Sequence, residues 1–142
     1  MLRRVVLDTS VVVAGLRSRL GAANAVLRLI DRKRLVPLAT PPLFLEYEEV
    51  LLRAEQRLAH GLSPTEVAQF LAELAALIEP VDLHFRWRPQ SSDSNDEMVL
   101  EAAMNGRADA LITYNVEDFL EPCRRFGLPV LTPAEVLQRV RT

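Results

Sequence analysis

The chain has 142 residues, of which 49% are hydrophobic and 25% are charged, a balance typical of one globular domain. A single cysteine, Cys123, excludes an internal disulfide, and the wide separation of His60 and His84 gives no spacing typical of a zinc site. We therefore expect one domain over residues 1–142 in a reducing compartment, the cytoplasm.

The first residues share some features with a signal peptide, because Arg3 and Arg4 precede an apolar stretch. Asp8 interrupts that stretch, and no part of the chain approaches the 18 or more apolar residues of a membrane span. We expect a soluble protein with no contact to a membrane.

The net charge of −2 conceals a division along the chain. Residues 1–34 contain eight of the 17 basic residues but only two of the 19 acids. Such a segment is either a solvated basic face or a surface that contacts phosphates. Arg17 and Arg19, directly after the first apolar stretch, are the candidates for phosphate contacts.

Five short apolar runs predict strands, at residues 4–7, 35–39, 78–83, 110–113 and 128–131. Helical stretches lie between them, and two of these helices, over 64–78 and 133–141, begin with the pattern of a capping box. The alternation predicts an α/β fold in which a mostly parallel five-stranded sheet is covered by helices on both faces, a three-layer α/β/α sandwich.

The positions of the prolines indicate which predicted strands lie at the edges of the sheet and which lie at its centre. Pro37, Pro80 and Pro129 mark three of the runs as edge-like or bent. The runs 4–7 and 110–113 contain no proline, so we expect them to be neighbouring central strands.

Asp8 directly follows the first strand, and Asp118 lies shortly after the other strand that lacks proline. Open α/β sheets bind ligands beyond the carboxyl ends of their strands, where the strand order reverses. We therefore expect these two acids to converge on one cleft.

The helix predicted over residues 42–54 adds a third acid. Its apolar stripe includes Leu43, Tyr47 and Val50, and Glu46 lies at the border of that stripe. Glu46 is the glutamate of this helix expected to point inward, although a solvated flank is the simpler interpretation.

A fourth acid, Asp96, falls in the first turn of the helix predicted over residues 93–103. Here helix capping is the simpler interpretation, because Asp93 and Asp96 have the spacing of a capping box and acids suit the positive end of a helix. Asp118 could likewise only cap a short helix.

Four acids near one cleft repel one another unless a divalent cation neutralises them. Oxygen ligands select Mg²⁺ or Mn²⁺, and such an ion activates water for phosphodiester hydrolysis without a protein nucleophile.

At these residues the chain resembles the PIN-domain nucleases, and in particular the VapC-like toxins of type II toxin–antitoxin systems. The stretches that carry the resemblance are VVLDTSVVVAG with Asp8 and Ser10, PPLFLEYEEVL with Glu46, SDSNDEMVLEAA with Asp96, and ALITYNVEDF with Asn115 and Asp118. Together they span about residues 4 to 133.

The resemblance implies a PIN-like fold and a Mg²⁺- or Mn²⁺-dependent endoribonuclease that acts on RNA, is neutralised by a small cognate antitoxin and forms a homodimer. Asp8, Asp96 and Asp118 would bind the metal, and Glu46 would bind it or orient the attacking water. Ser10 and Asn115 would hydrogen-bond around these ligands. The basic charge of residues 1–34 makes Arg17 and Arg19 the residues expected to contact the RNA.

One departure concerns the third motif, where Ser94 and Asn95 precede Asp96 and Glu97 follows it, so a metal-binding role for Glu97 stays open. The resemblance also admits a PIN-fold module that binds RNA or protein with little catalysis, and a nuclease for RNA processing or DNA flaps.

Other folds with an acid after the first strand fit poorly. A metal-ion-dependent adhesion site needs a hydroxyl where Val12 lies, and a haloacid-dehalogenase-like phosphatase needs an aspartate in place of Ser10. A receiver domain needs a lysine after its last strand, but Lys33 is the only lysine.

Overall fold

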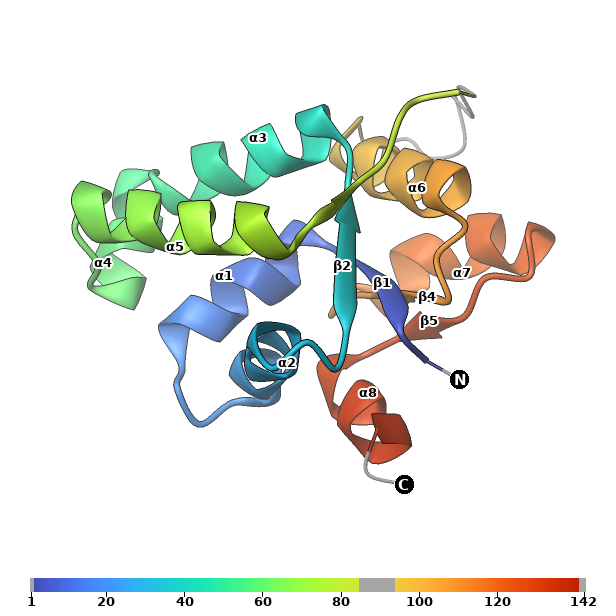
Figure 1. Cartoon of the computed structure of the whole chain (residues 1–142), viewed down its shortest axis with the longest axis horizontal. Coiled ribbons are helices and arrows are strands. Elements are labelled where there is room, and N and C mark those ends of the chain that lie inside the picture. Colours follow the sequence, from blue (N-terminus) through green and yellow to red (C-terminus); the bar gives the residue numbers. More distant parts are fainter. Residues whose placement is uncertain (1, 85–93, 141–142) are drawn as a thin grey trace.

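A five-stranded parallel sheet forms the centre of the molecule in the computed structural model, which describes residues 2–84 and 94–140 (Figure 1). The strands are β1 (Arg4–Leu7), β2 (Val36–Ala39), β3 (Glu79–Pro80), β4 (Ala110–Ile112) and β5 (Val130–Leu131), in the spatial order β3-β2-β1-β4-β5. All neighbouring pairs are parallel. The five predicted strands are thus confirmed, and β1 and β4 are neighbours as expected.

The expectation that Pro37 marks an edge-like strand is wrong, because β2 lies between β3 and β1. The amide of Val36 donates to the carbonyl of Arg3 at 2.8 Å, so position 37 faces the β3 side. Since β3 first pairs opposite Leu38, the missing N–H of Pro37 leaves no ladder position unfilled.

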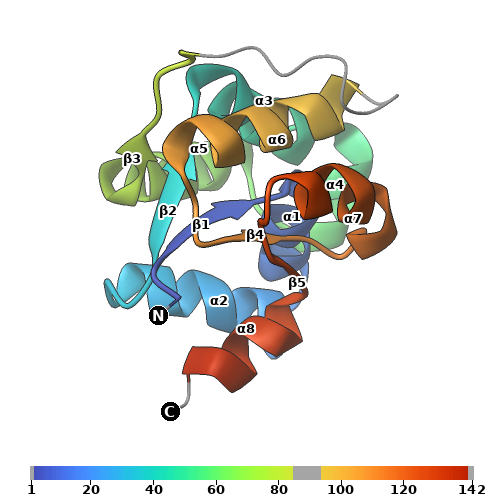
Figure 2. The same cartoon turned by 90° about the vertical axis from the view of Figure 1, so that its right-hand side faces the viewer.

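Eight helices surround the sheet in the described part of the chain: α1 (Thr9–Arg17), α2 (Ala22–Asp31), α3 (Pro41–Leu51), α4 (Ala54–His60), α5 (Pro64–Leu77), α6 (Ser94–Gly106), α7 (Val116–Arg125) and α8 (Pro133–Val140). Figure 2 shows α3 and α6 over one face and α2 and α8 over the other. The predicted three-layer α/β/α architecture is confirmed. None of the described helices combines the length and apolarity needed to cross a membrane.

Local sequence signals explain where several helices begin. The two predicted capping boxes form, between Ser63 and Glu66 before α5 and between Thr132 and Glu135 before α8. The hydroxyl of Thr40 caps α3 by accepting the amide of Leu43 at 3.3 Å.

Helix α3 ends earlier than the sequence suggested. It stops at Leu51, and Ala54 begins the separate helix α4, none of whose residues is buried. The apolar stripe that predicted a helix over 42–54 holds for its first three turns, where Leu43, Tyr47 and Val50 are buried. Helix α3 therefore keeps the length needed to carry Glu46.

Removing the cap of α3 should lower the stability of the fold. Thr40→Val keeps the shape of the buried side chain but loses the hydroxyl that accepts the amide of Leu43, so we expect about 1 kcal/mol less stability in urea unfolding. Thr40→Ser keeps the hydroxyl and should lose less. A larger loss in Thr40→Ser than in Thr40→Val would show that the methyl group, not the cap, stabilises this position.

Candidate active site

The site begins at Asp8, the first residue after the central strand β1. Its amide continues the ladder to β4 by donating to the carbonyl of Ile112 at 2.9 Å. The carboxylate is only 7% exposed, and its Oδ2 atom accepts hydrogen bonds from Ser10 Oγ at 2.8 Å and Thr113 Oγ1 at 2.7 Å. These two bonds compensate for the burial of the charge and fix the carboxylate in one orientation.

Asp8 occupies the N-cap position of α1, but its side chain makes no capping hydrogen bond. Both hydroxyls bind Oδ2, and Oδ1 receives no hydrogen bond from the described residues. A buried acid that neither caps its helix nor uses both oxygens has one oxygen left for a ligand. The geometry thus favours a binding role over a purely structural one.

Glu46 lies beside Asp8, on α3. It is 6% exposed, so the prediction that it points inward is confirmed and the solvated flank is wrong. The hydroxyl of Thr9 donates to Glu46 Oε2 at 3.0 Å. Burial raises the pKa of the Glu46 carboxyl, the bond from Thr9 opposes that rise, and the negative charge of Asp8 adds to it.

Tyr47 ties α3 to the strand that carries Asp8. Its hydroxyl donates to the carbonyl of Leu7 at 2.6 Å, and its ring is buried. Burial, followed by the charges of Asp8 and Glu46, raises the pKa of the Tyr47 hydroxyl well above its usual value. The phenol therefore stays protonated and remains a hydrogen-bond donor.

Thr113, which the sequence analysis did not select, is a central residue of the site. It follows β4, it is fully buried, and its hydroxyl both donates to Asp8 and accepts the amide of Asn115 at 2.9 Å. Thr9 was missed in the same way. The signal available in the sequence was a hydroxyl at the carboxyl end of each of the two central strands.

Ser10 and Asn115 were predicted to hydrogen-bond around the metal ligands. Ser10 does bind Asp8, and its Oγ also lies 3.4 Å from the amide of Tyr114. Asn115 is exposed at the N-cap of α7 and contributes main-chain groups, its amide to Thr113 and its carbonyl to the amide of Asp118. Its side chain makes no capping hydrogen bond.

The other two predicted acids lie in first turns of helices. Asp96 is partly buried in the first turn of α6, a helix that packs against β1, α3 and α7, and Glu97 beside it is buried. Asp118 is exposed in the first turn of α7. Asp93, considered above as the cap of α6, lies outside the described residues.

The structure brings Asp8 and Glu46 together but does not join Asp96 and Asp118 to them in a closed cluster. Within residues 2–84 and 94–140, no three Asp, Glu, His or Cys side chains lie close enough to form a metal site. The assembled part is a pair of buried carboxylates whose like charges a hard divalent cation would neutralise, so the donors fit Mg²⁺ or Mn²⁺.

Arg17 and Arg19 lie away from these acids. Arg17 is in the last turn of α1 and Arg19 follows that helix, and both are exposed. Because α1 starts beside Asp8 and has nine residues, its far end is about 13 Å along the helix axis. Contacts with a ligand at Asp8 would require a ligand of that length.

Comparison with known proteins gives two findings. A sequence model of the PIN domain matches residues 4–117 of the chain, whereas no curated protein matches it. The solved structure of VapBC-1 from nontypeable Haemophilus influenzae, at 2.2 Å resolution, is similar with a TM-score of 0.59 and 18% sequence identity. That similarity covers 92% of this chain and 98% of the other, and it extends the agreement in fold beyond the matched residues. The family match includes the strands and helices that carry Asp8, Glu46, Asp96 and Thr113, and the chain therefore belongs to the PIN-domain family.

Proposed function

We propose that the chain is a metal-dependent endoribonuclease that hydrolyses phosphodiester bonds of RNA. The observation that carries the proposal is the buried pair of Asp8 and Glu46, in which one oxygen of Asp8 receives no hydrogen bond from residues 2–84 and 94–140. This pair lies where the strand order reverses, the usual ligand position of an open α/β sheet.

In this proposal Asp8 and Glu46 hold a Mg²⁺ or Mn²⁺ ion, together with Asp96 and Asp118 from the first turns of α6 and α7. When bound, the ion would activate water and stabilise negative charge on the phosphate. Ser10 and Thr113 keep the Asp8 carboxylate in place, and Glu46 orients the attacking water.

We further propose that the protein is a toxin that works in the cytoplasm, that a small cognate antitoxin neutralises it, and that it forms a homodimer. The similarity to the solved VapBC-1 structure supports the antitoxin partner. Arg17 and Arg19 are proposed to contact RNA beyond the scissile phosphate.

Two other functions use the same fold: a module that binds RNA or protein with little catalysis, and a nuclease for RNA processing or DNA flaps. The first predicts RNA binding without cleavage, and the second predicts cleavage without growth arrest. The buried carboxylate pair favours catalysis, because a module that only binds RNA has no use for two acids that repel phosphates.

Asp8→Asn should abolish cleavage of single-stranded RNA in Mn²⁺, with a loss of at least about a hundredfold, because the amide is a poorer metal ligand than the carboxylate. A gel-based cleavage assay measures this loss, and induction in cells should show growth arrest for the wild type only. Asp31→Asn, an exposed acid on α2, is the matched control and should stay active. Cleavage that resists EDTA, or that persists in Asp8→Asn, would refute the proposal.

Glu46→Gln should stabilise the metal-free protein at neutral pH. Because folding raises the pKa of Glu46 above its ordinary value of 4.5, the folded state binds more protons than the unfolded state between these two values. Stability of the wild type therefore falls as the pH rises through that window, and glutamine removes the fall while it can still accept the bond from Thr9.

Thermal melts in EDTA from pH 4 to pH 8 measure this effect. Glu48→Gln, on the exposed side of the same helix, is the control and should follow the wild type. A wild type whose stability relative to Glu46→Gln did not decline with rising pH would contradict a destabilising charge at Glu46.

Thr113→Val should weaken metal binding, because it removes one of the two hydroxyls that orient Asp8. Loss of such an outer hydrogen bond typically costs about 10–100-fold in metal affinity. The measurement is the Mn²⁺ concentration for half-maximal cleavage, and Thr113→Ser should restore it. If serine and valine shifted that concentration equally, the hydroxyl would have no role in orienting Asp8.

A further inference from the structure

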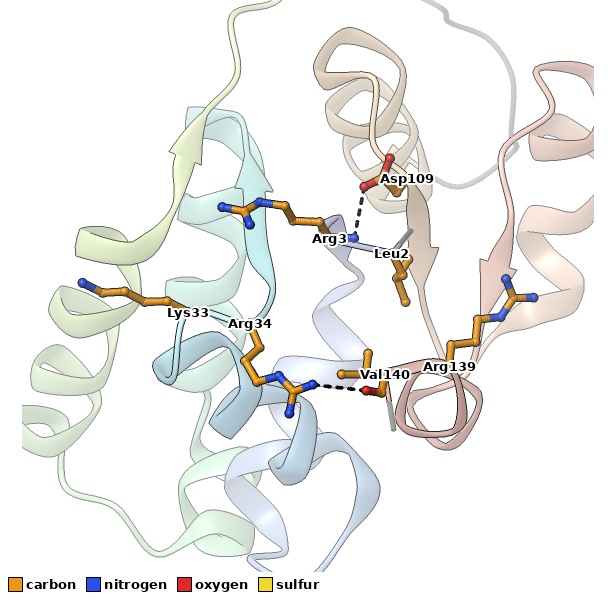
Figure 3. Close-up of a pocket in the computed structure, with 7 residues that line it drawn as sticks. All are labelled: Leu2, Arg3, Lys33, Arg34, Asp109, Arg139 and Val140. Atoms are coloured by element: carbon orange, nitrogen blue, oxygen red, sulfur yellow. Dashed lines mark hydrogen bonds between the residues drawn. The ribbon is translucent and has the colours of Figure 1, made fainter. Parts of the chain in front are cut away.

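A basic cavity of about 690 Å³ opens at the amino ends of the strands, the edge of the sheet opposite the carboxylate pair (Figure 3). Its basic side chains are Arg3 before β1, Lys33 and Arg34 before β2, and Arg139 in the last turn of α8. At about 3.3 Å per residue, Arg3 is roughly 17 Å along β1 from Asp8. The cavity is therefore separate from the candidate active site.

Among the described residues that line this cavity, the bases outnumber the acids. Asp109 is the one acid among the described residues that line it, and its Oδ2 atom accepts the main-chain amides of Arg3 at 3.1 Å and Arg4 at 2.8 Å. The side chains of Arg3 and Lys33 make no hydrogen bond or ion pair with the described residues. These two cations are thus available to an anionic ligand.

The cavity continues into a second hollow of about 330 Å³ along α2. The two share Arg34 and Val140, and Figure 3 shows the guanidinium of Arg34 reaching the carbonyl of Val140, at 3.2 Å. The second hollow adds Arg28 and Arg32, which are one helical turn apart. We call the two hollows together the amino-edge groove. Its six bases are spread over two adjoining hollows, an extent that suits a chain of phosphates better than a single small anion.

Lys33 follows α2 in the left-handed conformation, which Arg107 after α6 also adopts with a φ of 52°. Lys33 has a φ of 61°, and the amides of Lys33 and Arg34 close the end of α2 onto the carbonyls of Ile30 and Leu29, at 2.9 Å each. This turn normally places glycine where Lys33 lies, as it does at Gly127 after α7 with a φ of 67°. A lysine here is conformationally unfavourable, and it adds a cation to the groove.

We propose that the amino-edge groove binds the sugar–phosphate backbone of single-stranded RNA at a distance from the scissile bond. Guanidinium groups form paired hydrogen bonds with phosphate oxygens, and a line of them tracks a backbone without reading its sequence. This inference rests on the proposed function in taking RNA as the ligand. It assigns the basic N-terminal segment a site that Arg17 and Arg19 do not contribute to.

The test measures binding of a fluorescein-labelled single-stranded RNA of about 20 nucleotides by anisotropy over a range of salt concentrations. Asp8→Asn serves as the parent protein, so that cleavage does not interfere. Adding Arg3→Gln and Lys33→Gly should reduce the slope of log K against log salt by about 1.4, because each phosphate that a base neutralises on a single strand contributes about 0.7. Glycine is favourable at position 33, so the melting temperature should not fall and unfolding cannot explain the weaker binding.

The matched control is the pair Arg57→Gln and Arg125→Gln, two exposed bases on α4 and α7 that do not line the groove. This control should leave the slope unchanged. Lys33→Arg in place of Lys33→Gly should halve the reduction of the slope, because arginine keeps a cation at position 33. An equal fall in the control, or an unchanged slope in the groove variant, would overturn the inference. Displacement of the RNA by uridine monophosphate at equal phosphate concentration would also overturn it, because the groove would then bind a single small anion and not an RNA backbone.

The outcomes separate this inference from the proposed function. RNA binding that depends on the groove, in a wild type that cleaves no RNA, supports the groove and refutes the nuclease. If cleavage depends on metal but the slope of log K against log salt is unchanged in the groove variant, the groove inference is refuted and the nuclease proposal stands.

Discussion

The hydrogen bonds to one oxygen of Asp8 constrain the rest of the site. A buried carboxylate is costly unless donors compensate for its lost hydration, and here the donors come from the start of α1 and from the end of β4. Leu7 pairs with Ile112 in the parallel ladder, so the next residues, Asp8 and Thr113, meet. A shift of one residue in this register would turn Thr113 to the other face of the sheet and leave Asp8 without that donor.

The same constraint reaches α3. Tyr47 anchors this helix to the carbonyl of Leu7, one residue before Asp8, and thereby places Glu46 beside the first carboxylate. Without a cation, two neighbouring buried acids oppose folding, because burial and then the charge of Asp8 raise the pKa of Glu46. The hydrogen bonds of Thr9, Ser10 and Thr113 to these acids offset part of that cost. A site arranged in this way is destabilised when empty and stabilised by the ligand that neutralises it.

The sequence predicted what depends on local patterns. Hydrophobic runs located all five strands, proline-free runs identified the central pair, and the stripe on α3 identified Glu46. Hydroxyls after the two central strands were a local signal, but it did not single out Thr9 and Thr113, because their importance comes from partners 37 and 105 residues away. The prediction of an edge-like strand at Pro37 failed for a similar reason, since the effect of this proline depends on where β3 starts to pair with β2.

The position of the basic residues also depends on topology. In a parallel α/β sheet, helices begin at the carboxyl edge and end at the amino edge, so the helix dipoles favour acids at the first and bases at the second. This effect accounts for Arg28 and Arg139, which lie in the last turns of α2 and α8. It does not account for Arg3, which precedes a strand. The excess of positive charge at the amino edge is therefore larger than helix stability requires, and a polyanion along the groove is the ligand that would use it.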